Sequence, residues 1–78
     1  MDDFEFGQYL RRLRISNGLS QFQLGKLVGV SDRAVSKWEN GISKPKASII
    51  LKLCNTLSVS ADDLLKNMPD DKNKREVL

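Results

Sequence analysis

The side chains best suited to binding another molecule lie in the segment SQFQLGKLVGVSDRAVSKWENG, residues 20–41. Towards its end, four polar groups have the spacing that places side chains on one face of a helix. They are a carboxylate, a guanidinium, a hydroxyl and an ammonium. Such a set binds polar or anionic surfaces through hydrogen bonds and charge. Its members are Asp32, Arg33, Ser36 and Lys37.

The chain lacks the usual catalytic combinations. It contains no histidine, so the commonest general base and a common zinc ligand are both absent. The Gly25-Lys26 pair is typical of a phosphate-binding loop, but the glycine five residues earlier is missing, and Leu27 occupies the Ser/Thr position that would bind magnesium. We therefore expect no enzymatic activity, no metal site and no cofactor.

The composition is that of one small globular domain. The chain has 78 residues, of which 40% are hydrophobic and 29% charged. No apolar run approaches the ~20 residues that a membrane helix needs, and the start MDDFEF lacks the basic region of a signal peptide. The single cysteine, Cys54, cannot form an internal disulfide, which favours a reducing cytoplasm.

Positive charge is concentrated around the same central segment. The net charge is +3, and residues 20–44 carry four basic side chains (Lys26, Arg33, Lys37 and Lys44) against two acidic ones. A surface that binds a polyanion requires such an excess.

Apolar periodicity, caps and breakers predict five short helices and no strand. Ser20 with Gln23 has the capping-box pattern, and Gly29 suits a sharp turn after the second helix. Helices are expected at about residues 4–16, 21–28, 32–40, 46–57 and 61–66. We expect a compact all-α domain over residues 1–66 and a polar C-terminal tail over residues 67–78.

Several apolar side chains are expected to anchor the central helices and close the core. Glycine in mid-helix costs ~1 kcal/mol of helix propensity relative to alanine. We expect Gly25 to offset this cost by letting the helix at 32–40 cross closely. Leu64 and Leu65 are expected to close the core from the last helix. In the central segment, the apolar side chains predicted to share one direction are Leu24, Leu27, Val30, Val35 and Trp38.

The other face of the helix at 32–40 has the chemistry of a helix that reads DNA, since the major groove, about 12 Å wide, admits one helix. Arg33 carries the fork that matches O6 and N7 of guanine, and Lys37, one turn later, can reach guanine or phosphate. Ser36 is small enough to let the helix lie close. Three roles are open for Asp32. It could accept a hydrogen bond from cytosine N4, orient Arg33, or stabilise the start of the helix as a first-turn acid.

Contacts to the DNA backbone would fix position without reading sequence. Gln21 lies at the start of the second helix, where outward-pointing amides favour an anion. Asn40, Ser43 and Lys44 lie beyond the reading face and could hold the same strand from the other side. The alternative for Gln21 and Asn40 is that they are ordinary exposed residues at helix ends.

The combined pattern resembles the helix-turn-helix family of phage Cro proteins and repressors, also called the xenobiotic-response-element family. The resemblance rests on Ser-Gln-x-x-Leu-small, Gly-Val-Ser, Val-Ser-Lys-Trp-Glu-Asn-Gly and Lys-Pro, and it covers about Phe6 to Leu65. It implies a five-helix, lambda-repressor-like DNA-binding domain that binds a two-fold-symmetric operator as a homodimer.

The resemblance also implies roles for individual positions. Base contacts fall to Asp32, Arg33, Ser36 and Lys37, and phosphate contacts to Gln21, Asn40 and the backbone amides of Ser43 and Lys44. It pairs Arg14 with Glu39 as a structural ion pair, with phosphate contact by Arg14 as a secondary role.

Three positions depart from the family's pattern. Gly25 replaces its usual alanine, which keeps the close crossing but loosens the second helix. Ser58 stands where glycine commonly ends the fourth helix, so a different turn is expected there. Cys54 replaces a usual alanine and is interpreted as a small buried residue, with a redox sensor as the alternative.

We therefore expect a sequence-specific double-stranded-DNA-binding transcriptional regulator, a repressor, which is cytoplasmic and prokaryotic or phage-encoded. Its dimer contact is expected in the region of Leu57 to Leu65. The alternative is an antitoxin-like or coactivator-like protein-interaction module that presents the same basic helix face to an acidic protein. A steep dependence of DNA affinity on salt would separate the two.

Overall fold

The computed structural model describes residues 3–67, which form five helices joined by short turns and contain no strand. The predicted all-α fold is confirmed. Residues 68–78, which include nearly all of the predicted tail, lie outside the described residues, so the boundary at residue 66 stays a prediction. The helices are α1 (Asp3–Ser16), α2 (Gln21–Val28), α3 (Asp32–Glu39), α4 (Ala47–Leu57) and α5 (Ala61–Lys66).

The observed helix bounds differ from the predicted ones by about one residue. α3 ends at Glu39, with Asn40 as its C-cap, and α4 begins after Lys46, which is its N-cap. The longest helix, α1, has 14 residues. Within residues 3–67, no helix combines the length and the apolar character needed to cross a membrane.

Serine hydroxyls begin three of the helices. Ser20, Ser31 and Ser60 have extended backbone, and each hydroxyl accepts from the backbone N–H three residues later. At α2, the Gln23 side chain also accepts from the N–H of Ser20 at 2.8 Å, which completes the predicted capping box. These contacts satisfy N–H groups that have no partner within a helix.

The turns after α2 and α4 both use left-handed backbone. Gly29 has φ 86°, and its N–H donates to the carbonyl of Gly25 at 2.8 Å. Ser58 has φ 60° and ψ 45°, and the following residue, Val59, donates to the carbonyl of Cys54. The expectation of a different turn at Ser58 is therefore wrong. Serine keeps the geometry that glycine would take, at a strain of roughly 1 kcal/mol.

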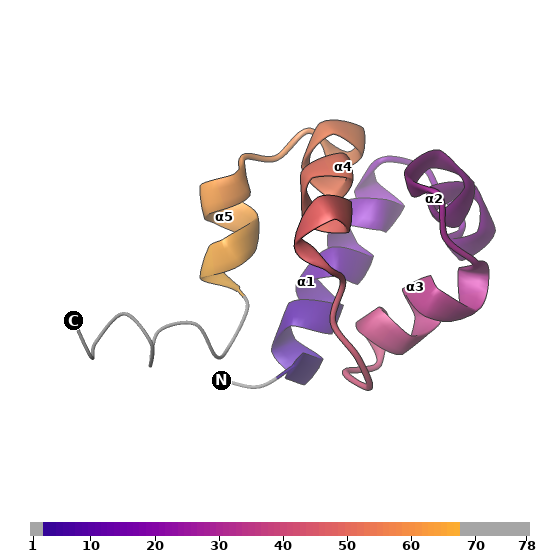
Figure 1. Cartoon of the computed structure of the whole chain (residues 1–78), viewed down its shortest axis with the longest axis horizontal. Helices are drawn as coiled ribbons and strands as arrows, with labels where there is room; N and C mark the ends of the chain where they lie inside the picture. Colours follow the sequence, from indigo (N-terminus) through magenta and orange to yellow (C-terminus); the bar gives the residue numbers. More distant parts are fainter. Residues whose placement is uncertain (1–2, 68–78) are drawn as a thin grey trace.

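The five helices pack as a small bundle (Figure 1). α3 packs against α1 and α2, while α4 packs against α2 and α5. In Figure 1 the α2–α3 pair and α5 lie on opposite sides of α4, and α3 lies at the edge of the molecule. One side of α3 is therefore left open.

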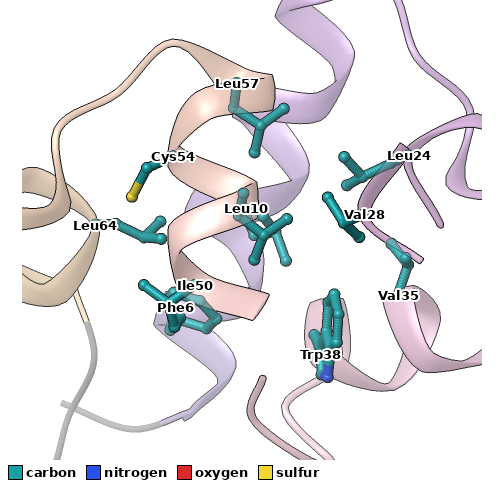
Figure 2. Packing of buried hydrophobic residues seen from close by; sticks show 11 residues of the cluster. Phe6, Leu10, Leu24, Val28, Val35, Trp38, Ile50, Cys54, Leu57 and Leu64 are labelled. Carbon is teal, nitrogen blue, oxygen red and sulfur yellow. The ribbon is translucent and has the colours of Figure 1, made fainter. Parts of the chain in front are cut away.

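Side chains from all five helices meet in one core (Figure 2). Leu10, Leu24, Val35, Leu53 and Leu64, one from each helix, are fully buried. Burying such a side chain contributes about 1.5–3 kcal/mol. Because helices of this length are marginal on their own, this shared core is what stabilises them.

Two leucines that were expected in the core are exposed. Leu27 is 59% exposed and Leu65 is 43% exposed. An α-helix turns about 100° per residue. The buried arc of α2 is set by Leu24 and Val28, and Leu27 falls outside it; Leu65 likewise lies one step past the buried Leu64. Both expectations are wrong because a short helix buries only one narrow arc.

Two glycines allow close approach of backbone segments. A Cβ at Gly25 would lie 2.6 Å from the carbonyl oxygen of Val30, so the close crossing expected there is with the turn that leads into α3. A Cβ at Gly7, in the middle of α1, would overlap the carbonyl oxygens of Trp38 and Glu39. The role of Gly7 in seating the end of α3 on α1 was missed, because nothing near Gly7 in the sequence indicates it.

Candidate nucleic-acid interface

α3 is anchored on one side and open on the other. Val35 is fully buried, and Trp38 and Glu39 are 5% and 3% exposed. These three side chains hold the helix against the rest of the fold. The predicted base-contacting residues occupy the remaining positions: Asp32, Arg33 and Lys37 are exposed and Ser36 is half-buried.

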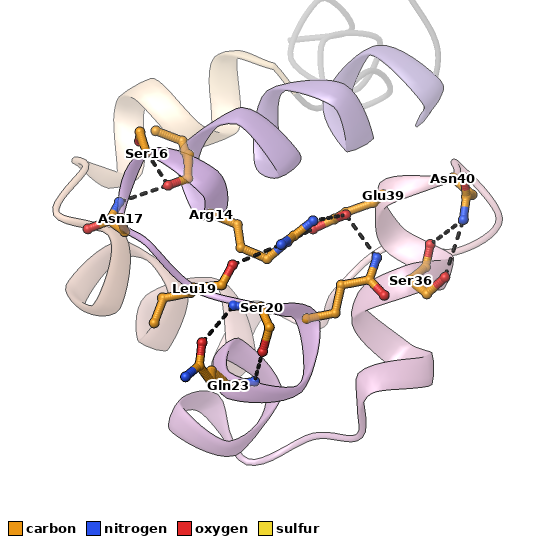
Figure 3. Close-up of polar contacts among 11 residues, drawn as sticks. Arg14, Ser16, Asn17, Leu19, Ser20, Gln23, Ser36, Glu39 and Asn40 are labelled. Carbon is orange, nitrogen blue, oxygen red and sulfur yellow. Dashed lines mark hydrogen bonds and ion pairs between the residues drawn. The ribbon is translucent and has the colours of Figure 1, made fainter.

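Glu39 is held by a buried arginine from α1 (Figure 3). Nε and Nη2 of Arg14 donate to its two carboxylate oxygens at 2.6 and 3.1 Å. Nη1 of Arg14 donates to the carbonyl of Leu19 at 2.8 Å. The ion pair implied by the family resemblance is thus present, and the guanidinium is engaged within the protein.

Gln21, at the first position of α2, is bonded to the same glutamate. Its Nε2 donates to Oε1 of Glu39 at 3.0 Å. An ionised carboxylate can only accept, so the amide nitrogen must face Glu39, and its second hydrogen stays available for another acceptor. Glu39 therefore fixes the direction of a side chain that sequence analysis places at the DNA backbone.

The side chain of Asn40 turns back along α3 (Figure 3). Its Nδ2 donates to the carbonyl oxygen of Ser36 at 2.9 Å and to the hydroxyl oxygen of Ser36 at 3.3 Å. Asn40 is exposed, and its amide nitrogen bonds to both oxygens of Ser36. A phosphate contact by Asn40 would share this nitrogen with Ser36.

The chain leaves α3 through a Schellman motif. Gly41 has left-handed backbone (φ 76°), and the N–H of Ile42 donates to the carbonyl of Lys37 at 2.9 Å. The N–H of Gly41 donates to the carbonyl of Trp38 at 3.2 Å. The N–H of Ser43 reaches the same Lys37 carbonyl only at 3.4 Å. This long bond leaves the amide of Ser43 open to a stronger acceptor such as phosphate.

The loop brings further positive charge next to α3. Lys44 and Lys46 border a groove of about 380 Å³ that is also lined by Ala34 and Trp38 of α3 and by Pro45. Lys26, by contrast, lies on α2 with its Nζ 5.7 Å from the ring centroid of Phe22. The basic residues of the central segment are therefore divided between the surface around α3 and the outer side of α2.

Cys54 is unpaired and buried, as expected for a small core residue. Burial raises the pKa of its thiol, which disfavours the reactive thiolate. The pKa of Tyr9 is raised by burial and by the Asp63 carboxylate. In the part of the chain that the structure describes, no three His, Cys, Asp or Glu side chains are grouped as metal ligands would be.

The two short helices α2 and α3 are joined by a sharp glycine turn, and α3 has one buried and one open side. This arrangement is a helix-turn-helix motif. The chain belongs to the helix-turn-helix family, whose model matches residues 10–64. The resemblance seen in the sequence is thereby confirmed.

Relatives of this chain include regulators and an antitoxin. It is 38% identical over 61 residues to the SPbeta prophage-derived HTH-type transcriptional regulator YonR of Bacillus subtilis (strain 168), covering 78% of this chain and 56% of YonR. It is 40% identical over 60 residues to repressor protein C2 of Salmonella phage P22, covering 77% of this chain and 28% of C2. It is 30% identical over 59 residues to the antitoxin PezA of Streptococcus pneumoniae serotype 4, covering 76% of this chain and 37% of PezA.

One relative has also been solved with DNA. The crystal structure of the P22 c2 repressor in complex with a synthetic operator matches with a TM-score of 0.75 and 39% identity, covering 80% of this chain and 94% of that one. The chain spans about half the length of YonR and less than a third of C2. The likeness therefore concerns the helix-turn-helix domain.

Proposed function

We propose that this chain is a sequence-specific double-stranded-DNA-binding transcriptional regulator that acts as a repressor. One observation carries the proposal. α3 is fixed by Val35 and Trp38 on its inner side and keeps Arg33 and Lys37 exposed, on a helix at the edge of a helix-turn-helix fold. A helix of that kind can enter the major groove without disturbing the core.

Base contacts are assigned to the open side of α3. Arg33 is suited to guanine, whose O6 and N7 its two-pronged guanidinium matches, and Lys37 follows one turn later. Ser36 lies between them in the sequence, and its short side chain would let α3 approach the groove floor closely. Asp32, in the first turn of α3, is the acidic member of the face.

Phosphate contacts are assigned to the two ends of the motif. Gln21 keeps one amide hydrogen for an acceptor while Glu39 holds the other. On the far side of α3, the same strand is assigned to the weakly bonded amide of Ser43 and to the side chain of Lys44, which borders the groove beside α3. Such contacts fix the register of the helix in the groove.

Two copies are expected to bind one operator, because one helix reads too few bases for useful specificity. The solved relative is a repressor bound to a synthetic operator, which supports binding of this domain to an operator. The proposed contact lies between residues 57 and 65, where Leu57 and Leu64 are buried and Leu65 is the exposed apolar side chain. Half-sites about 34 Å apart would match one turn of the duplex.

Selection of binding sites from random duplexes tests the proposal. A preferred, two-fold-symmetric site is expected, with affinity that falls steeply between 50 and 200 mM salt, roughly tenfold for every two phosphates neutralised. Equal binding to selected and random duplexes would refute it.

The second candidate function is favoured by one observation, the likeness to an antitoxin. An antitoxin-like module would present Arg33 and Lys37 to an acidic protein. It predicts weak DNA binding with no preferred site, and so the selection experiment decides between the two.

A further inference from the structure

Asparagine ends three of the helices in the same manner. In each case Nδ2 donates to the backbone carbonyl four residues earlier, and the backbone of the asparagines that end α3 and α5 is nearly identical, at φ −95°, ψ 5° and φ −94°, ψ 3°. The three bonds are Asn17 to Leu13 at 2.8 Å, Asn40 to Ser36 at 2.9 Å and Asn67 to Asp63 at 2.9 Å. The contact is thus a recurring C-terminal cap of this fold.

Asn40 differs from the other two in what else it reaches. Of the three residues capped, Ser36 carries a hydroxyl, and Nδ2 of Asn40 also lies 3.3 Å from that hydroxyl oxygen. A backbone carbonyl can only accept, so the atom of Asn40 facing Ser36 must be the amide nitrogen. The Ser36 hydroxyl oxygen therefore accepts a hydrogen bond from Asn40.

We propose that Asn40 is a positioning residue that makes Ser36 a hydrogen-bond donor towards DNA, and that Ser36 thereby selects a base with an acceptor on its major-groove edge. The inference rests on the proposed function, and it restricts which bases the operator can carry opposite Ser36. Purine N7, guanine O6 and thymine O4 are such acceptors, whereas cytosine presents only the donor N4–H₂ there.

The hydroxyl chemistry supports this direction. A serine hydroxyl has one hydrogen and two lone pairs, and Asn40 occupies one of the lone pairs. Within residues 3–67, no acceptor takes the hydroxyl hydrogen of Ser36. Accepting a bond also polarises the hydroxyl and strengthens it as a donor. Once the groove excludes water, an unmet donor is costly, so an acceptor base is favoured.

Both contacts of Asn40 to Ser36 run through the same amide nitrogen. The amide oxygen of Asn40 can only accept a hydrogen bond, as phosphate oxygens do, so this oxygen does not bind phosphate. The contacts within the protein thus couple Asn40 to the reading face through Ser36.

The test measures base preference with the full chain. The base pair facing Ser36 is identified as the one whose preference is lost in Ser36→Ala among selected duplexes. At that position, replacing the preferred base by cytosine is expected to weaken wild-type binding about fivefold, the worth of one neutral hydrogen bond. Asn40→Ala, and Asn40→Gly as a second variant, should reduce this discrimination to within about twofold.

Asn67→Ala is the matched control, because it removes the same cap on α5, away from α3. It should retain the fivefold discrimination. If Asn40→Ala weakens all duplexes equally and keeps the preference, Asn40 binds phosphate and the inference is wrong, while the proposed function stands. If Ser36→Ala leaves every base preference intact, the inference is wrong as well. The absence of any preferred site for the wild type would overturn both.

Discussion

Arg14 and Glu39 lie 25 residues apart in the sequence and form a two-point ion pair, with nitrogen–oxygen distances of 2.6 and 3.1 Å. Their side chains are only 11% and 4% exposed. The pair ties α1 to the end of α3, and through Gln21 it also reaches the start of α2. The buried carboxylate of Glu39 thus fixes the position of α3 relative to α1 and α2.

Glu39→Ala should therefore lower stability more than Asn40→Ala. Removing the carboxylate leaves the buried Arg14 guanidinium unpaired, which costs about 3–5 kcal/mol. Removing the exposed Asn40 costs about 1 kcal/mol, the scale of one neutral hydrogen bond. Thermal and urea unfolding measure both. The reverse order would contradict a structural role for the pair.

Replacing both members of the pair gives an independent check. The double variant Arg14→Leu, Glu39→Leu removes both buried charges, and its loss should be smaller than the sum of the two single losses. Additive losses would mean that the two side chains are not coupled.

Gly7→Ala should destabilise the fold by about 1–3 kcal/mol, although alanine favours a helix over glycine by about 1 kcal/mol. The added Cβ would overlap backbone oxygens of Trp38 and Glu39, and backbone cannot move aside as a flexible side chain can. Urea unfolding is the measurement. Arg11→Ala, at an exposed site of the same helix, is the control and should be nearly neutral; a stabilised Gly7→Ala would refute the close contact.

Ser58→Gly should stabilise the fold by about 0.5–1 kcal/mol. Serine at φ 60° and ψ 45° carries left-handed strain that glycine lacks, and the glycine's extra freedom in the unfolded chain cancels part of the gain. Asn55→Gly, within α4, should instead cost up to about 1 kcal/mol. Equal melting-temperature shifts for the two variants would mean that Ser58 is unstrained.

Arg33→Ala and Lys44→Ala should weaken DNA binding in different ways. Loss of Arg33 should cost about 1–3 kcal/mol and relax the preference at one base pair. Loss of Lys44 should weaken all sequences alike and lower the salt slope by about 1. Titrations of selected and mutated duplexes at several salt concentrations separate the two. Identical behaviour would show that the assignment of the faces is wrong.

Leu65→Lys should reduce cooperative binding to two half-sites and leave binding to one half-site unchanged. Leu65 is 43% exposed at the end of the proposed dimer region, and a charge in an apolar contact opposes association. Leu51→Lys is the control, since Leu51 is 62% exposed on α4 outside that region. Equal loss of cooperativity in both variants would place the dimer contact elsewhere.

Local patterns in the sequence predicted most of the fold. Serine caps, glycine turns and apolar spacing involve residues within about four positions of one another, so the helix bounds were predicted to about one residue. The capping box at Ser20 and Gln23 and the buried Val35 and Trp38 follow from the same short-range rules. The Arg14–Glu39 pair came from family resemblance, since no local rule links residues 25 apart.

Only the tertiary structure decided which residues from distant segments make contact. It also decided which arc of each helix faces solvent. Leu27 and Leu65 have core-like side chains, but their helices present them to solvent. Gly7 is required by the backbone of α3, which lies far along the chain. The sequence of residues 20–41 was sufficient by itself to predict a helix with an exposed polar face. How Glu39 orients Gln21 and how Asn40 bonds to Ser36 was decided by side-chain geometry, because spacing alone says which groups are near but not which atom donates.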